Sequence, residues 1–319
     1  MTKLQAGIIG CGQIAGGYDT DCKKGWSLTH ACSYQLLDNV ELVATSDPDD
    51  KVRAEFCEKW GVKNDYADHK EMLEDLELDI VSICSPTEYH IDAFRAISEV
   101  ESVKGVFCEK PLSYKLDEAR EIADLAKGKI VSLNYFRRWN LTLQQLRKDL
   151  KSKKYGEVQY ITVRYTKGLL TNGSHLVDLL YWMFGEPIGY FCYFIHSKNS
   201  YDPGVDFKLA FQNEVTAVLL HVPDVPYVYI EIDILTDAGK LSIKQRGQQI
   251  EWSDVVIEPN YHTFNMLKSD TIKETKWQDC PTRALKELID VVQCGGDVYC
   301  TPMDGLKVGE ICARILSLE

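Results

Sequence analysis

The chain has 319 residues, of which 45% are hydrophobic and 26% are charged, and its formal net charge is -12. This composition is typical of globular proteins, and the length is sufficient for two domains. The negative charge argues against nucleic acid or an anionic membrane as a partner. No apolar run approaches the ~20 residues of a membrane span, and the first residues predict no signal peptide, so we expect a cytoplasmic protein.

The 11 cysteines are scattered along the chain. No two of them have Cys-x-x-Cys spacing, and no His–Cys cluster has the spacing of a zinc site. We therefore expect reduced, mostly buried thiols and no metal site. Cys11 and Cys108 are interpreted as small packing residues.

An apolar run over residues 4–9 leads directly into a glycine-rich turn. Gly10, Gly12 and Ala15 have the spacing of a dinucleotide-binding turn, in which they allow a tight turn, a close approach to a pyrophosphate and close helix packing. We expect the phosphates at the N-terminus of a short helix after the turn. The alternative is a loop that merely turns the chain. The predicted cofactor-binding residues here are Gly10, Gly12, Gln13 and Ile14.

A polar segment, residues 17–29, separates this turn from the second predicted strand at 40–46. It makes the distance from Gly10 to the acidic residue Asp47 longer than the usual ~20 residues. We interpret the segment as a partial lid over cofactor or substrate, with Trp26 as a stacking surface. A surface loop unrelated to chemistry is the alternative.

Asp47 itself has two interpretations, which do not exclude each other. At the end of the second strand, it would bind the adenosine ribose hydroxyls and favour NAD over NADP. Before Pro48, it would instead cap the next helix. Lys51 and Arg53 are near enough in the sequence to leave NADP open as the cofactor.

Strands and helices alternate through the first part of the chain. The predicted strands are 40–46, 80–84, 103–108 and 130–133, and the predicted helices are 49–60, 90–97 and 116–126. Such alternation predicts an α/β fold with a doubly wound parallel sheet and right-handed crossovers. We place a dinucleotide-binding Rossmann domain at residues 1–134.

The pattern changes after about residue 135. The predicted elements are helices at 141–151 and 174–184, strands at 158–164, 207–211, 215–221, 228–235 and 241–244, and final helices at 283–294 and 304–316. Strands that follow one another without helices predict an antiparallel open sheet, and hence an α+β domain over residues 135–319 for substrate binding and oligomerisation. The open face of that sheet needs a cover, which favours a homodimer or homotetramer.

Polar side chains stand out at two places in these elements. Lys110 follows a buried strand, where a lysine is costly to desolvate unless it is used or paired. His175 and Asp178 share a face at the start of the predicted helix 174–184. The alternatives are a lysine that bends out to solvent and a structural histidine.

Five short motifs in order resemble the Gfo/Idh/MocA family, which includes glucose–fructose oxidoreductase, inositol dehydrogenase and rhizopine-catabolism proteins. Each is weak alone, but five in order are strong, and the likeness to the family spans essentially the whole chain. The motifs are Gly10-x-Gly12-x-x-Ala15, Ser85-Pro86-Thr87-x-x-His90, Glu109-Lys110-Pro111, Asn134-Tyr135-x-x-Arg138 and Gly173-Ser174-His175-x-x-Asp178.

The resemblance implies a role for each matching position. Lys110 would lie next to the nicotinamide, before a proline that is often cis, and His175 would be the catalytic histidine. The further cofactor-binding residues would be Ser85, Pro86, Thr87, His90, Glu109 and Lys110. Arg138 is expected to meet a phosphate or carboxylate of the substrate, or to pair with an acid.

The sequence departs from the family pattern at one position. The family usually has an aspartate four residues before the histidine, where this chain has Thr171, followed by Asn172. Both side chains can hydrogen-bond a substrate hydroxyl, but neither can take its proton at neutral pH. A histidine, with an ordinary pKa of ~6.5, is a better base than a lysine at ~10.4. We therefore assign His175 as general acid/base, with Lys110 polarising the substrate oxygen or sharing the proton.

The resemblance thus implies an NAD(P)-dependent oxidoreductase. It would transfer a hydride to or from a secondary hydroxyl or keto carbon of a sugar, cyclitol or nucleotide-sugar, with NAD as the expected cofactor. Two alternatives stay open at this point. One is an NAD(P)-binding regulatory protein without turnover, and the other is an NAD-dependent glycosidase that works by elimination with no net redox change.

Overall fold

The computed structural model describes residues 3–22, 25–197, 200–223 and 225–318. Its contacts divide the chain into two compact units, Met1–Trp139 with Gln278–Gly309, and Asn140–Trp277 with Glu310–Glu319. This division differs from the predicted boundary after residue 134, because residues 278–309 return to the first unit. Helix α8 (Cys280–Cys294) explains the return, since it packs against α1 and the last two strands of the first sheet. The sequence did not predict this return, because the apolar face of a helix does not indicate which of two sheets it packs against.

The first unit is built on a six-stranded parallel sheet in the order β3-β2-β1-β4-β5-β6. This order confirms the predicted doubly wound fold. The strands are β1 (Leu4–Ile9), β2 (Val40–Ser46), β3 (Asn64–Tyr66), β4 (Ile80–Ile83), β5 (Gly105–Cys108) and β6 (Ile130–Leu133). The helices besides α8 are α1 (His30–Gln35), α2 (Asp50–Trp60), α3 (His69–Asp75), α4 (His90–Ser98) and α5 (Leu116–Leu125), with short turns η1 (Gln13–Gly17), η2 (Thr87–Tyr89) and η3 (Phe136–Trp139).

The ends of α2 are set by local sequence. Asp49 caps its start, because its carboxylate accepts hydrogen bonds from the backbone N–H groups of Lys51 at 3.0 Å and Val52 at 3.1 Å. The predicted cap at Asp47 is wrong, since the helix begins too late for that side chain to reach its first turn. Gly61, with φ of 70°, ends the helix as predicted.

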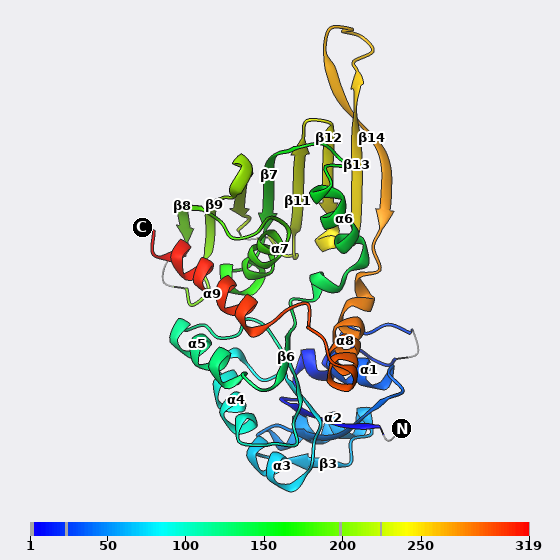
Figure 1. Cartoon of the computed structure of the whole chain (residues 1–319), viewed down its shortest axis with the longest axis vertical. Coiled ribbons are helices and arrows are strands. Elements are labelled where there is room, and N and C mark those ends of the chain that lie inside the picture. The colour runs from blue at the N-terminus through cyan, green and yellow to red at the C-terminus, as the bar shows by residue number, and fades with distance from the viewer. Residues whose placement is uncertain (1–2, 23–24, 198–199, 224, 319) are drawn as a thin grey trace. The chain divides into compact units, whose positions relative to one another are not determined.

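The second unit is an eight-stranded sheet in the order β14-β13-β12-β11-β7-β10-β9-β8, in which only β7 and β10 pair in parallel among the described strands. The predicted α+β architecture is confirmed, and α6 and α7 lie over one face (Figure 1). The strands are β7 (Val158–Tyr165), β8 (Gly189–His196), β9 (Gly204–Ala210), β10 (Thr216–His221), β11 (Ile230–Thr236), β12 (Gly239–Lys244), β13 (Gln249–Ile257) and β14 (Asn265–Glu274). The helices are α6 (Leu141–Lys151), α7 (Ser174–Phe184), preceded by η4 (Leu169–Gly173), and the end of α9 (Pro302–Leu316), which begins in the first unit. The short turns are η5 (Gln212–Glu214) and η6 (Gln245–Gly247), and η7 (Trp277–Asp279) spans the point where the chain passes from the second unit to the first.

The two faces of this second sheet differ in burial. Along β7 and β11, alternate residues such as Ile161 and Ile234 are buried beneath the helices. Their neighbours point the other way: Tyr160 of β7 and Leu235 of β11 remain 38% and 37% exposed, and Leu220 of the adjacent β10 is 40% exposed. The second face of the sheet is therefore exposed and partly apolar.

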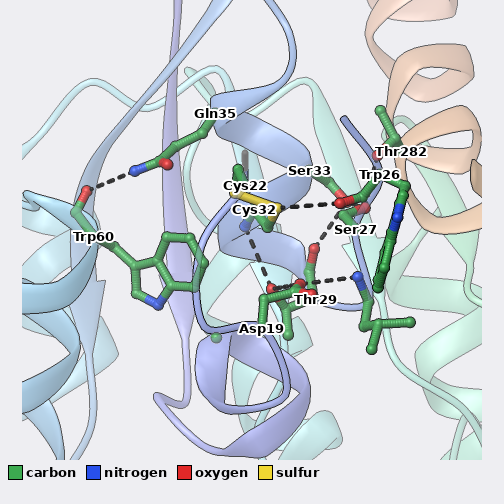
Figure 2. The surroundings of a disulfide bond; sticks show 12 residues. Asp19, Cys22, Trp26, Ser27, Thr29, Cys32, Ser33, Gln35, Trp60 and Thr282 are labelled. Atoms are coloured by element: carbon green, nitrogen blue, oxygen red, sulfur yellow. Dashed lines mark hydrogen bonds between the residues drawn. A yellow bond between two sulfur atoms is a disulfide. The ribbon is translucent and has the colours of Figure 1, made fainter. Parts of the chain in front are cut away.

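The segment over residues 17–29 is held to the first unit by several bonds (Figure 2). Cys22 and Cys32 form a disulfide with their Cα atoms 5.6 Å apart. The Asp19 carboxylate accepts hydrogen bonds from the Leu28 N–H at 2.8 Å and the Thr29 hydroxyl at 2.7 Å. Residues 23 and 24 of the segment lie outside the described residues, Trp26 is half-buried, and its lid role stays a prediction.

The disulfide corrects the expectation that all cysteines are reduced thiols. Pairing of two cysteines depends on the distance between their Cα atoms. A spacing of ten residues does not reveal that distance, because it depends on the fold of the intervening loop. The first turn of α1 brings Cys32 back toward Cys22.

Within the described part of the chain, no helix combines the length and the apolar character needed to cross a membrane. The same residues contain no group of three or more His, Cys, Asp or Glu side chains placed to hold a metal ion.

Candidate cofactor and catalytic site

The glycine-rich turn lies at the carboxyl ends of β1 and β4, where the strand order reverses and ligands bind in such folds. Gly10 has φ of 90°, and a Cβ there would lie 2.6 Å from the backbone nitrogen of Ser85. Only glycine combines that backbone conformation with so close an approach of two chain segments. The structure thus supports the tight turn that the sequence predicts at Gly10.

Gly12 and Gln13 are exposed at the outer side of this turn. No heavy atom of the described residues comes within 4 Å of the place where a Gly12 Cβ would stand, so its backbone is open to a ligand. The turn continues as η1, a single turn in which Ile14 is half-buried, rather than as the short α-helix expected. Close packing occurs at Gly16, beside the buried Ala15, where a side chain would overlap Trp60 of α2.

Asp47 follows β2 at the same edge of the sheet. Its Oδ2 accepts a hydrogen bond from the backbone N–H of Cys11 at 2.8 Å, and its Oδ1 accepts one from the N–H of Asp49 at 3.0 Å. Each carboxylate oxygen keeps another lone pair, which can accept a ribose hydroxyl. The side chain is thus held at the turn with acceptor capacity to spare.

Arg53, the nearest arginine in sequence, is already engaged. Its guanidinium donates to the Asp47 carbonyl at 2.6 Å, to Asp65 at 2.7 Å and to Asp50 at 2.7 Å. The side chain is only 12% exposed. Two carboxylates therefore neutralise the charge that would otherwise attract a 2′-phosphate.

The loop after β4 carries the next group of predicted cofactor residues. Ser85 is half-buried and Pro86 is exposed, while Thr87 is buried at the start of η2. The Ser85 hydroxyl oxygen is buried and has no hydrogen-bond partner among the described residues. Such an atom fits a bound group that supplies the missing bond. The Ser85 hydroxyl and the open backbone at Gly12 are therefore both consistent with a dinucleotide bound at this edge of the sheet.

His90 departs from its expected role in cofactor binding, because it is fully buried. Its Nδ1 lies 3.2 Å from the Leu112 carbonyl and its Nε2 lies 3.1 Å from the Ser85 carbonyl. Burial lowers the pKa of His90, against the opposing effect of these carbonyls. The side chain supports two backbone loops and does not reach the surface that a ligand contacts.

Glu109 is 8% exposed and belongs to a buried polar network at the end of β5. Its Oε1 lies 3.1 Å from Nε2 of His30 and accepts a hydrogen bond from the Asn134 amide at 2.7 Å. Burial raises the pKa of Glu109, but the bond to His30, the charge of Lys110 and the Asn134 amide outweigh it, so the pKa is lowered overall. The lowered pKa favours an ionised Glu109 carboxylate, next to Lys110 in the sequence.

No motif in the sequence pointed to His30. It is 1% exposed at the start of α1 and stacks on Phe107 with ring centroids 4.5 Å apart. The only local signal was a histidine directly after Thr29, which caps the helix.

Lys110 follows β5 and is half-buried. Its backbone N–H donates to Oε2 of Glu109 at 3.3 Å. The Lys110–Pro111 peptide bond is cis, as the resemblance implies. The backbone of Lys110 is thus held at the carboxyl end of β5.

In the second unit, η4 runs directly into α7. Gly173, between them, has helical φ and ψ, and the Ser174 hydroxyl donates to the Leu170 carbonyl at 2.6 Å. His175 is 8% exposed and Asp178 is 1% exposed. Because Thr171 and His175 are four residues apart on continuous helical backbone, their side chains share a face.

Thr171 and Asn172 are both tied to neighbouring segments. The Asn172 amide donates to the Thr166 carbonyl at 2.9 Å. The Thr171 side chain is exposed, and both its hydroxyl and its backbone N–H, the latter at 2.9 Å, donate to Oδ2 of Asp202. Sequence analysis missed Asp202, which lies between β8 and β9 and matches no motif.

Arg138 is not available to a substrate, contrary to the first of its two expected roles. It is 2% exposed, donates to the Tyr299 carbonyl at 2.9 Å and lies 3.2 Å from Oδ1 of Asp304. The pairing with an acid is thus the role that the structure gives it, because η3 places the side chain inside the first unit beside the start of α9.

The N-terminal part of the chain matches the model of a known protein family. The model of the Gfo/Idh/MocA oxidoreductase family, NAD-binding Rossmann fold, matches residues 4–135. D-glucoside 3-dehydrogenase of Escherichia coli (strain K12) is 29% identical over 207 residues, 58% of this chain and 55% of that protein. Myo-inositol 2-dehydrogenase of Thermotoga maritima is 30% identical over 162 residues, 50% of this chain and 44% of that protein. The chain thus spans about half the length of these curated relatives.

Solved structures resemble this chain over its whole length. A putative NADPH-dependent oxidoreductase from Desulfitobacterium hafniense has a TM-score of 0.81 at 16% identity, covering 100% of this chain and 96% of that one. The WlbA dehydrogenase from Chromobacterium violaceum, solved with NADH and UDP-GlcNAcA, has a TM-score of 0.78 at 18% identity, covering 100% and 94%. At these identities the likeness is one of fold. Residues 4–135 thus match the NAD-binding Rossmann domain of the Gfo/Idh/MocA oxidoreductase family, and this match supports NAD(P) as the cofactor.

Proposed function

We propose that this protein is an NAD-dependent dehydrogenase acting on a secondary hydroxyl of a sugar, cyclitol or nucleotide-sugar, or on the corresponding ketone. The observation that carries the proposal is Lys110, which follows β5 at the edge of the matched NAD-binding domain and whose backbone N–H donates to the buried Glu109 carboxylate. The relatives named as glucoside and inositol dehydrogenases support the substrate class. Those names favour neither a regulator without turnover nor a glycosidase.

Each side chain has a distinct role in this proposal. Bound NAD+ supplies the hydride acceptor. His175 takes the proton of the reacting hydroxyl, and returns it in the reverse direction. Lys110 polarises the same oxygen, while Thr171 and Asn172 bind other polar groups of the substrate.

The test is a screen of free sugars, cyclitols and nucleotide-sugars with NAD and with NADP, followed by the absorbance of the reduced cofactor. We expect reduced cofactor to accumulate with at least one compound. Product release without net reduction would indicate elimination instead. Cofactor binding without any turnover would indicate a regulatory protein.

The cofactor arm of the screen is expected to favour NAD over NADP by about 10-fold or more in kcat/KM, because Asp47 repels a 2′-phosphate and Arg53 is neutralised. Asp47→Ala should raise the KM for NAD about 10-fold and reduce the preference, since it removes ribose hydrogen bonds and the repelling charge. Asp68→Ala, which removes the cap of α3, is the matched control. An unchanged NAD/NADP ratio in Asp47→Ala would contradict the assignment.

We also propose a homodimer or homotetramer. The partly apolar exposed face of the second sheet, with Tyr160, Leu220 and Leu235, supports it. Sedimentation of the protein as a monomer at micromolar concentration would contradict it.

A further inference from the structure

The Asp202 carboxylate is built into the turn that precedes the helix of His175. It accepts hydrogen bonds from the backbone N–H groups of Leu170 at 2.6 Å and Thr171 at 2.9 Å, and from the Thr171 hydroxyl. Gly168 leaves the space, because a side chain there would collide with the Asp202 carboxyl group. Three donors from one turn and a glycine on the same turn hold this carboxylate in one place.

The carboxylate determines the direction in which Thr171 forms hydrogen bonds. A hydroxyl has one proton and two lone pairs, whereas an ionised carboxylate only accepts. The single proton of the Thr171 hydroxyl is therefore committed to Asp202. The exposed Thr171 oxygen can offer only lone pairs to a ligand, so its partner must be a donor such as a hydroxyl.

Thr171 in the single π-turn η4 and His175 in the first turn of α7 are one turn apart on continuous helical backbone, so their side chains lie on the same side of it. A hydroxyl held by Thr171 would therefore belong to the same part of the substrate as the hydroxyl that His175 serves. We propose that Asp202 is a positioning residue that makes Thr171 an acceptor for a second substrate hydroxyl, so that the site selects a vicinal diol. This inference rests on the proposed function and specifies the substrate feature that the site recognises.

Three substitutions separate this role from a structural one. Asp202→Asn keeps the shape of the side chain, but an amide N–H group then faces either the Leu170 N–H or both Thr171 donors. Thr171→Val removes the hydroxyl at nearly constant size, and Thr171→Ser retains it. Asp206→Asn is the matched control, since Asp206 is a half-buried carboxylate on β9 that accepts the His221 N–H at 2.7 Å and does not contact η4 in any described bond.

The probes are D-glucose, methyl D-glucoside and myo-inositol, each with its monodeoxy analogues, assayed with NAD. We expect Asp202→Asn and Thr171→Val each to raise the KM about 10-fold for the diol that the wild type oxidises best, with kcat and its pH profile retained. For the analogue without the neighbouring hydroxyl, the same variants should stay within about 2-fold of wild type. The double variant should lose no more than either single one, and Thr171→Ser should restore the wild-type KM.

Equal losses for the diol and its deoxy analogue would overturn the inference, as would additive losses in the double variant. Either result would show that Asp202 only maintains the fold, which is the kind of effect expected of the control variant Asp206→Asn. If Asp202→Asn does not fold, the exposed Thr171→Val carries the same comparison. Failure of the wild type to oxidise any compound in the full screen of free sugars, cyclitols and nucleotide-sugars would overturn the proposed function, and with it this inference. Normal wild-type turnover with unchanged variants would overturn this inference alone.

Discussion

Replacing His175 by glutamine is expected to lower kcat about 10²–10⁴-fold while leaving NADH binding intact. Glutamine retains hydrogen-bonding capacity but cannot exchange a proton at neutral pH, so it removes acid–base function more selectively than a smaller residue would. Steady-state kinetics on the best substrate of the screen and fluorescence titration with NADH measure the two quantities. His262→Gln, at an exposed position on the second unit, is the control.

Lys110 belongs to the same prediction. In the proposed mechanism Lys110 and His175 act on one substrate oxygen, so the effects of replacing them should not be independent. Lys110→Met keeps the length of the side chain and removes its charge, and we expect a loss in kcat similar to that of His175→Gln. The double variant should lose less than the product of the two single losses. Lys127→Met is the control, since Lys127 is an exposed lysine two residues after the end of α5. Near-normal turnover in Lys110→Met would refute the assignment of this residue.

Sequence patterns located the elements whose boundaries are set by neighbouring residues. The helix predicted at 49–60 is α2, Asp50–Trp60, since its cap and its terminal Gly61 lie within the same stretch. Strands β13 and β14 were missed, because much of Gln249–Ile257 and Asn265–Glu274 is exposed and shows little apolar alternation. Their pairing with each other and with β12 is a tertiary property.

The candidate site shows the same difference between features set by neighbouring residues and features that depend on distant ones. Motifs made of adjacent residues, such as Glu109-Lys110-Pro111, could be recognised directly. His30 and Asp202 could not, because His30 lies 79 positions from Glu109 and Asp202 lies 31 positions from Thr171. Both are polar groups whose role depends on a distant partner. The same reason explains Arg138, whose engagement by Asp304 becomes evident only once η3 and α9 are folded.

Glu109→Ala is expected to lower the free energy of unfolding by about 3 kcal/mol, the order of magnitude for breaking a buried polar pair. The substitution leaves His30 and Asn134 without their common acceptor in a region where water cannot easily replace it. Urea unfolding followed by circular dichroism measures the loss. Glu121→Gln, which affects an exposed carboxylate paired with Arg95, is the control and should change stability by less than about 1 kcal/mol.

The pH dependence of Glu109→Gln provides the sharper test of the charge. The pKa of Glu109 is lowered in the folded protein from its ordinary 4.5. The unfolded chain therefore binds the proton more readily, and the stability contributed by the carboxylate is fully present above pH 4.5 and is lost as the pH falls through the lower folded pKa. The difference in unfolding free energy between wild type and Glu109→Gln should thus be constant near neutrality and shrink below pH 4.5. A difference that stays constant or grows on acidification would mean that Glu109 is not held as a carboxylate next to Lys110.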